Sequence, residues 1–269
     1  MTSSTTNSPL SISLPSYQKP PVNEVVFGLR FTTPEGIRMP HAGLLWQKFQ
    51  TDYPIIQHAA PIASAKGEIQ IDMITGVPLP RFWFINIEDD QLVQFQFDRL
   101  YYNWRRRKND YPRYNYVRSA FETVYDKTAQ FFNELKFGDI FPLEYELTYI
   151  NHIPKGDGWD SIEDLPKIFN DFNWNYYKES RFLPKPQRIS WRSEFSLPDE
   201  KGSLIVSLKH AIRSDDNSPI IVLELKTNGF CKSADKKNIF EWFDFSHEWI
   251  VKGFTDLTTI DVQKIWGKI

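Results

Sequence analysis

The feature that most constrains this chain is an alternation of apolar and polar residues with a period of two, which recurs along most of its length. In LEYELTYINHI, residues 143–153, the apolar Leu143, Tyr145, Leu147 and Tyr149 alternate with polar or charged residues. Such alternation places one set of side chains on each face of a β-strand. Runs of β-branched, aromatic and other apolar residues bounded by turn residues predict further strands at residues 22–31, 67–73 (a weaker pattern), 81–88, 92–104, 188–197, 202–213 and 219–230.

Four segments depart from this pattern and predict helices. Residues 114–136 and 238–257 carry apolar side chains at helical spacing over several turns. Shorter helices are predicted at 41–53 and at 161–172, where Ser161 has the residue type and position of an N-cap. Antiparallel strands combined with a few helices predict an α+β fold.

The order of these elements reads β-α-β-β-β-α twice. Residues 21–140 would form the first unit and residues 141–269 the second, while residues 1–20, rich in Ser, Thr and Pro, would form a disordered tail. We expect the duplicated units to join into one merged domain. Its curved antiparallel sheet would carry the two long helices on one face, which buries the apolar side of the alternating strands.

Charge and cysteine content narrow the functional classes. The formal net charge is −2, so no global positive field attracts polyanions. The one cysteine, Cys231, excludes an internal disulfide framework. The first twenty residues show neither a basic region nor a continuous apolar stretch, so no signal peptide is expected. These observations predict a cytoplasmic protein without membrane partners.

A segment rich in arginine and aromatic residues, DRLYYNWRRRKNDYPRY, covers residues 98–114, and its basic character extends to Arg118. Between Arg99 and Arg118 there are seven basic residues and one acid. After Arg99 the apolar phase of the strand shifts, which predicts a bulge or a sharp twist. Three interpretations stay open: a strand end with core aromatics, a protein interface, or a single-strand nucleic-acid site. The candidate contact residues are Arg99, Tyr102, Trp104, Arg105, Arg106, Arg107 and Arg113.

The polar faces of the strands offer a second candidate surface. Arg192 and Glu194 should stand on the sheet face opposite the helices, together with Asp98, Glu144, Glu146 and Glu224. Long side chains of both charges on a concave face can hold a protein or a peptide. Arg192 and Glu194 therefore join the predicted partner-binding residues. The main hypothesis is a non-catalytic interaction or scaffold protein whose partner is another protein.

Evidence for catalysis is weak. The chain contains no GxSxG, P-loop or GxGxxG motif, and its histidines do not pair at metal-binding spacing. We therefore predict no metal, cofactor or catalytic residue. A hydrolase that uses dispersed carboxylates and a small polar site at Asn151 and His152 stays a third hypothesis.

Four segments together resemble a sporadically distributed, uncharacterised family of bacterial proteins of similar length. They are KPPVNEVVFGLRF, FQFDRLYYNWRRRKNDYPRY, ELTYINHI and the terminal SHEWIVKGFTDLTTIDVQKIWGKI. The resemblance covers Pro20 to Ile269 and implies no particular activity or cofactor. It also implies a histidine shortly before the terminal Trp-Gly pair, where this chain has Gln263. A sporadic distribution is typical of accessory genes, so the resemblance suggests a role in bacterial defence or regulation, beside a partner encoded nearby.

Overall fold

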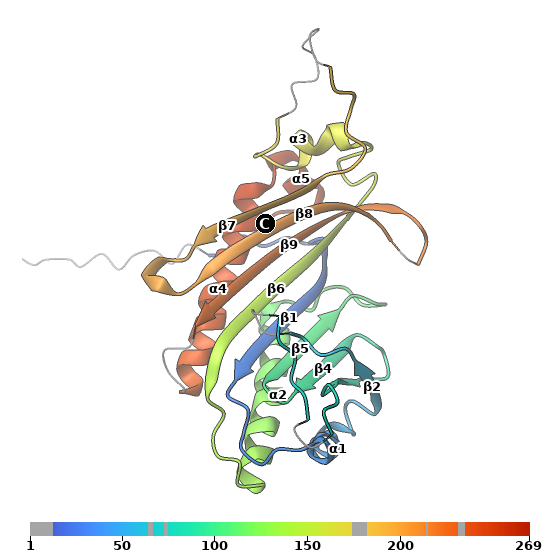
Figure 1. The fold of residues 1–269 in the computed structure, drawn as a ribbon. Helices are drawn as coiled ribbons and strands as arrows, with labels where there is room; N and C mark the ends of the chain where they lie inside the picture. Colours follow the sequence, from blue (N-terminus) through green and yellow to red (C-terminus); the bar gives the residue numbers. More distant parts are fainter. Residues whose placement is uncertain (1–12, 64–66, 73–74, 174–181, 214, 231–234) are drawn as a thin grey trace, which may run out of the picture.

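The computed structural model describes residues 13–269 except 64–66, 73–74, 174–181, 214 and 231–234. Within these residues the fold is α+β, as predicted, with a nine-stranded antiparallel sheet in the order β2-β3-β4-β5-β1-β6-β9-β8-β7. Figure 1 shows an open, twisted sheet that runs from β2 to β7. The strands are β1 (Val22–Phe31), β2 (Ile55–Ala59), β3 (Arg81–Ile85), β4 (Gln91–Gln96), β5 (Arg99–Arg105), β6 (Pro142–Pro154), β7 (Ser190–Ser196), β8 (Ser203–Ile212) and β9 (Pro219–Phe230).

Five α-helices accompany the sheet in the described part of the chain. Helix α2 packs against β5 and β1, and α4 packs against β6 and β9. Phe27 of β1 contacts Phe121 of α2 and Phe243 of α4, with ring centroids 5.2 and 5.0 Å apart. The core therefore forms where the alternating apolar residues of the strands meet the helices. The helices are α1 (Met39–Phe49), α2 (Tyr114–Glu134), α3 (Leu165–Ile168), α4 (Lys236–Leu257) and α5 (Ile260–Ile265).

The single strand predicted at residues 92–104 is in fact two strands. The chain turns at Phe97 and Asp98, so that β4 and β5 pair as a tight hairpin, with Gln96 opposite Arg99. This turn, and not the expected bulge or sharp twist, causes the change of apolar phase after Arg99. Reversal of the chain at this point keeps the apolar residues of both strands on the core side.

Two other local predictions fail for identifiable reasons. Residues 67–72 form no strand, and Ile71 makes only an isolated bridge to Pro78, while residue 73 lies outside the described residues. The strand of this region is instead β2, whose residues are mostly exposed because it lies at the sheet edge. Helix 161–172 is broken into a 3₁₀ turn and the short α3, although Ser161 is confirmed as the N-cap residue of that turn in a capping box with Asp164.

The predicted disordered tail reaches too far along the chain. Residues 1–12 lie outside the described residues, but residues 13–20 pack against the C-terminal end. Tyr17 is buried and forms a β-bridge with Lys268. Its hydroxyl lies 2.8 Å from that of Thr255. A short N-terminal segment thus becomes part of the folded domain.

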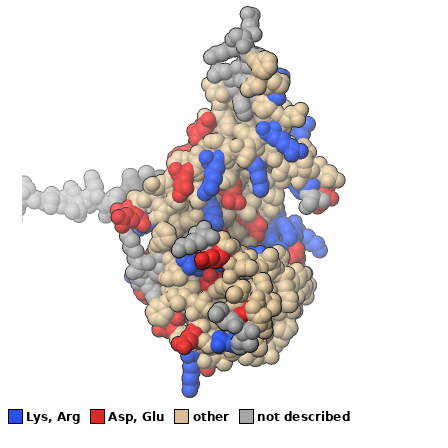
Figure 2. Space-filling model, in the orientation of Figure 1, with Lys and Arg blue, Asp and Glu red and all other residues tan. Residues whose placement is uncertain are grey.

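The face of the sheet opposite to Phe27 is polar. Figure 2 shows Lys and Arg side chains interspersed with Asp and Glu over the strands of this face. Lys226 Nζ lies 2.7 Å from Glu146 Oε2 across β9 and β6, and Arg30 Nη2 lies 2.6 Å from Glu144 Oε1 across β1 and β6. No helix in the described part of the chain combines the length and apolar character needed to cross a bilayer.

Candidate functional site

Three of the predicted contact residues lie in the interior. Tyr102 and Trp104 point into the core, with 0% and 2% of their surface exposed. Arg99 is also buried; its Nε donates to Asp98 Oδ1 at 3.2 Å and its Nη2 donates to the carbonyl of Ala63 at 3.1 Å. In this conformation none of the three offers a free surface to a partner. Tyr102 and Trp104 of β5 therefore belong to the core, whereas Tyr101 lies on the other face of the strand beside Gly28.

The arginine run that follows β5 is held by the chain itself. Arg105 and Arg107 both donate to the carboxylate of Asp89 in the β3–β4 turn, Arg107 Nε at 2.8 Å from Oδ2. Arg106 Nη2 donates to the carbonyl of Pro20 at 3.1 Å. These contacts fix the three side chains in defined positions and neutralise part of their charge.

Arg113 and Arg118 complete the basic segment. Arg113 is the N-cap residue of α2 and donates through Nη1 to the carbonyl of Tyr17 at 2.7 Å. Arg118 pairs with Asp244 on α4, with Nε 2.8 Å from Oδ1. Six of the seven basic residues between Arg99 and Arg118 therefore donate to acceptors of this chain.

Arg192 and Glu194 are exposed on the edge strand β7. Arg192 lies in the same row across the polar face as Arg105, five strands away, which is roughly 24 Å at ~4.8 Å per strand. The two cations stand at the ends of this row, and two carboxylates lie between them. From β7 to β5 the row reads Arg192, Ser207, Glu224, Ile150, Glu24 and Arg105.

A polar groove of about 810 Å³ lies beside this face. The N-terminal segment, the loop after β5, the end of β6 and the β8–β9 hairpin form its walls. It brings Arg106 and Arg107 together with charged residues that sequence reasoning did not associate with them. The cations are Lys19, Arg106, Arg107 and Arg213, and the carboxylates are Asp110, Asp157 and Asp215.

His152 lines the same groove. Burial lowers its pKa most, and Arg213 lowers it further, whereas Asp215 acts in the opposite direction. Asn151 turns to the other side of β6, where its Nδ2 donates to the carbonyl of Leu223 at 3.1 Å. The two neighbours therefore do not form the single polar site that the sequence hypothesis joined.

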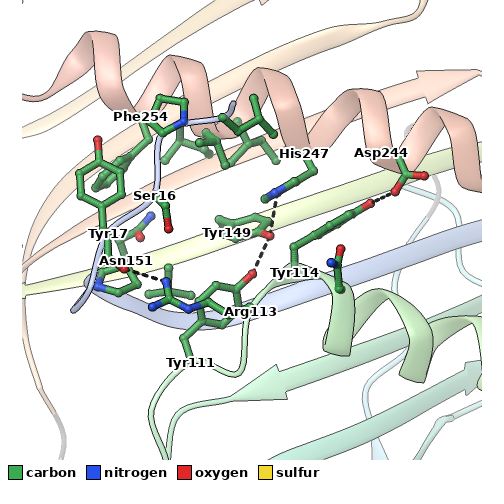
Figure 3. Close-up of a pocket in the computed structure, with 18 residues that line it drawn as sticks. Ser16, Tyr17, Tyr111, Arg113, Tyr114, Tyr149, Asn151, Asp244, His247 and Phe254 are labelled. Atoms are coloured by element: carbon green, nitrogen blue, oxygen red, sulfur yellow. Dashed lines mark hydrogen bonds between the residues drawn. The ribbon is translucent and has the colours of Figure 1, made fainter. Parts of the chain in front are cut away.

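A second hollow, of about 610 Å³, was not predicted. Figure 3 shows its lining, which comes from the N-terminal segment, the start of α2, β6 and α4. The wall is mainly apolar and contains a chain of three polar groups. The hydroxyls of Tyr111 and Tyr149 are 2.9 Å apart, and the hydroxyl of Tyr149 lies 3.1 Å from His247 Nδ1.

Tyr114 fixes the imidazole of His247 from the α2 side. The two rings stack in parallel, with centroids 3.8 Å apart and an interplanar angle of 1°. Burial lowers the pKa of His247 to about 4, against the opposing effects of Asp244 and Glu248. The imidazole is therefore neutral at pH 7.

Two absences apply to the described residues. No group of three or more His, Cys, Asp or Glu side chains there could hold a metal ion. Cys231 lies outside the described residues, so its surroundings do not enter the argument. Comparisons with models of protein families, with curated proteins and with solved structures give no match.

Proposed function

We propose that the protein is a non-catalytic binding protein that holds another polypeptide in the polar groove and on the adjoining sheet face. The observation that carries this proposal is the interleaving of four cations with three carboxylates in one groove. A polypeptide presents both charge signs and can match such a pattern, whereas the carboxylates would repel a phosphate backbone.

Preorganisation of the groove supports the same function. Asp89 holds the guanidinium groups of Arg105 and Arg107, and the Pro20 carbonyl holds that of Arg106. Side chains that are already ordered lose less conformational entropy when a partner binds. We place the protein in the bacterial cytoplasm, as a component of a defence or regulatory system with a partner encoded nearby. Its resemblance to the sporadic bacterial family stays a prediction.

The experiment is capture of the tagged protein from its own host at moderate salt. Proteins in the eluate are identified by mass spectrometry, and nucleic acid is measured on a nuclease-checked gel. We expect a stoichiometric protein partner. The test variant exchanges two groove charges, Arg213→Asp with Asp215→Arg, which preserves the net charge. The matched control exchanges an exposed pair on α5, Asp261→Lys with Lys264→Asp, whose charged groups lie 2.9 Å apart.

Loss of the partner from the groove variant, with retention by the control, would support the proposal. A second variant, Arg192→Glu with Glu194→Lys, tests the sheet face in the same way. Retention of every partner by both the groove and the sheet-face variants would refute it.

A single-strand nucleic-acid site is the second candidate function, favoured by one observation. Four cations, Lys19, Arg106, Arg107 and Arg213, line the groove together and could contact successive phosphates. If about five cations met phosphates, log affinity against log salt would have a slope of roughly −3.5 on a single strand. A slope near zero would end this candidate.

We also propose that the domain arose by duplication, with α2 and α4 as equivalent helices on one face of the sheet. Strand order supports this idea, because β3-β4-β5-β1 is mirrored by β7-β8-β9-β6 about the β1–β6 junction. The contacts of Phe27 with both helices are consistent with it. In this view β2 is an addition to the edge of the first unit.

A further inference from the structure

The cavity beside α2 and α4 has the size and character of a small-molecule site. Its volume of about 610 Å³ falls within the range of roughly 300–1,000 Å³ that such sites occupy. Leu225, Ile250, Val251 and Phe254 form a continuous apolar wall from β9 and α4. A site of this kind usually combines such a wall with a few fixed polar groups, and here those groups lie at the start of α2 and on β6.

Arg113 is the polar group that selects the charge of a ligand. It lines the cavity, and its contacts are hydrogen bonds to the carbonyls of Tyr17 and Gln18; among the described residues it forms no ion pair. Its backbone has φ of +81° and ψ of 159°, a conformation that only glycine adopts easily. Such strain is retained where the surrounding structure holds a side chain in one place, and it is frequent at binding sites.

The beginning of α2 adds to the positive character of the same place. Helix α2 starts at Tyr114 beside the cavity, has no side-chain cap and carries no acidic residue in its first turn. Its first amide groups therefore contribute the partial positive charge of a helix N-terminus. This end of the cavity thus combines the guanidinium of Arg113 with the uncapped first turn of α2, and the described residues of that turn include no acid.

The other charged group of the lining is already neutralised. Asp244 accepts hydrogen bonds from the Tyr114 hydroxyl at 2.6 Å and from Arg118 Nε at 2.8 Å. The neutral His247 adds no charge, and its Nδ1 faces the hydroxyl of Tyr149. Arg113 is therefore the cation that a ligand in the cavity meets.

We propose that this cavity binds a small amphipathic acid, with an apolar or aromatic body and one anionic group. The anionic group lies against Arg113 and the first turn of α2, and the body packs on the α4 wall. The Tyr111–Tyr149–His247 chain offers hydrogen bonds to a polar substituent on the body. The proposal does not depend on the polar groove, because Pro20 is the one residue that lines both hollows in the described part of the chain.

Isothermal titration calorimetry with 1-naphthoate tests the proposal, and 1-naphthamide serves as its uncharged isostere. We expect 1-naphthoate to bind one to one and at least about tenfold more tightly than 1-naphthamide, the ratio expected for one charge-assisted contact. This comparison needs no variant and stands even if substitutions disturb folding. Absence of 1-naphthoate binding to the wild-type protein, or equal affinity for the two probes, would overturn the proposal.

Three variants locate the bound probe. Val251→Trp fills the cavity and should abolish binding of 1-naphthoate, while Arg113→Gln should reduce its affinity to that of 1-naphthamide. Lys252→Gln removes a cation from the exposed side of α4 and should leave the affinity unchanged, since Lys252 pairs with Glu248 outside the cavity. Circular dichroism confirms folding of each variant. Undiminished binding by a folded Val251→Trp variant would place the probe elsewhere and refute the cavity site.

Discussion

Acidification should destabilise the protein through His247, the half-buried imidazole between Tyr114 and Tyr149. Its pKa is about 4 in the folded chain and 6.5 when unperturbed. Between these values the unfolded chain binds a proton that the folded chain does not, so stability must rise with pH. The stabilisation is fully present above pH 6.5 and is lost as the pH falls towards 4.

The magnitude follows from linkage. For one proton with pKa values of 6.5 unfolded and about 4 folded, the free energy of unfolding should fall by about 2 kcal/mol between pH 7 and pH 5. Other groups titrate in the same range. Burial raises the pKa of Glu24 and of Asp98, and these carboxyl groups therefore favour the folded state on acidification. A direct comparison of two proteins that share them isolates the histidine.

The assay is urea denaturation at pH 7 and at pH 5 for the wild-type protein and for His247→Asn. Asparagine keeps a hydrogen-bonding group near the Tyr149 hydroxyl but does not titrate in this range. We expect the variant to be less stable at pH 7 and to lose about 2 kcal/mol less than the wild type at pH 5. An equal loss in the two proteins would show that His247 takes up its proton in the folded state, and the reasoning would fail.

Four further substitutions test other parts of the structure. Gly28→Ala places a Cβ 2.3 Å from the ring of Tyr101, and it should lower the free energy of unfolding in urea by about 1–3 kcal/mol. Gly43→Ala serves as the control, because Gly43 on α1 has open space around it, and it should stabilise the protein by about 1 kcal/mol. An equal effect of the two substitutions would contradict the close approach of Gly28 to Tyr101. Asp89→Asn retains a residue that tolerates the positive φ of 57° but removes the charge shared by two arginines, and should cost about 1–3 kcal/mol by the same assay. Gln263→Leu removes the side-chain amide that donates to the carbonyls of residues 255 and 258 at 2.7 Å. The thermal midpoint of this variant should fall by about 2–4 °C for each kcal/mol of stability lost. An unchanged midpoint would show that these carbonyls find other donors.

Strands β8 and β9 were the most predictable part of the fold. The expected segments at 202–213 and 219–230 correspond closely to β8 and β9, because each is a long run rich in β-branched and other apolar residues that ends at turn residues. Edge strand β2 was not predicted, because most of its side chains are exposed. A strand with both faces exposed needs no alternation of apolar and polar residues. The β4–β5 turn escaped because Asp98 is a single turn-forming residue between Phe97 and Arg99, with no Gly, Pro or Asn beside it.

The site was far less predictable than the fold. Composition singled out Tyr102 and Trp104 as contact residues, but aromatic side chains next to arginines are equally suited to the core, which is where β5 places them. The cavity draws on the N-terminal segment, the start of α2, β6, β9 and α4. The spacing of residues within one segment cannot predict that side chains from several separate segments line the same cavity. Two features of the sequence gave partial indications of the cavity. The alternation in β6 predicted that Tyr149 points inward, and the pattern of the last long helix placed His247 on an amphipathic helix.

The central position of β1 has a consequence for how the chain is made. β1 can pair with β5 as soon as the chain has been synthesised beyond residue 105. Its other edge belongs to β6, and residues 32–141 separate β1 from that strand. Until β6 emerges from the ribosome, an apolar strand, VNEVVFGLRF, keeps one edge unpaired. Open edges of this kind recruit other chains, and pairing over such a separation is slow. The junction that unites the domain is therefore also where a nascent chain is most prone to aggregate, and slower, cooler expression should raise the yield of folded protein.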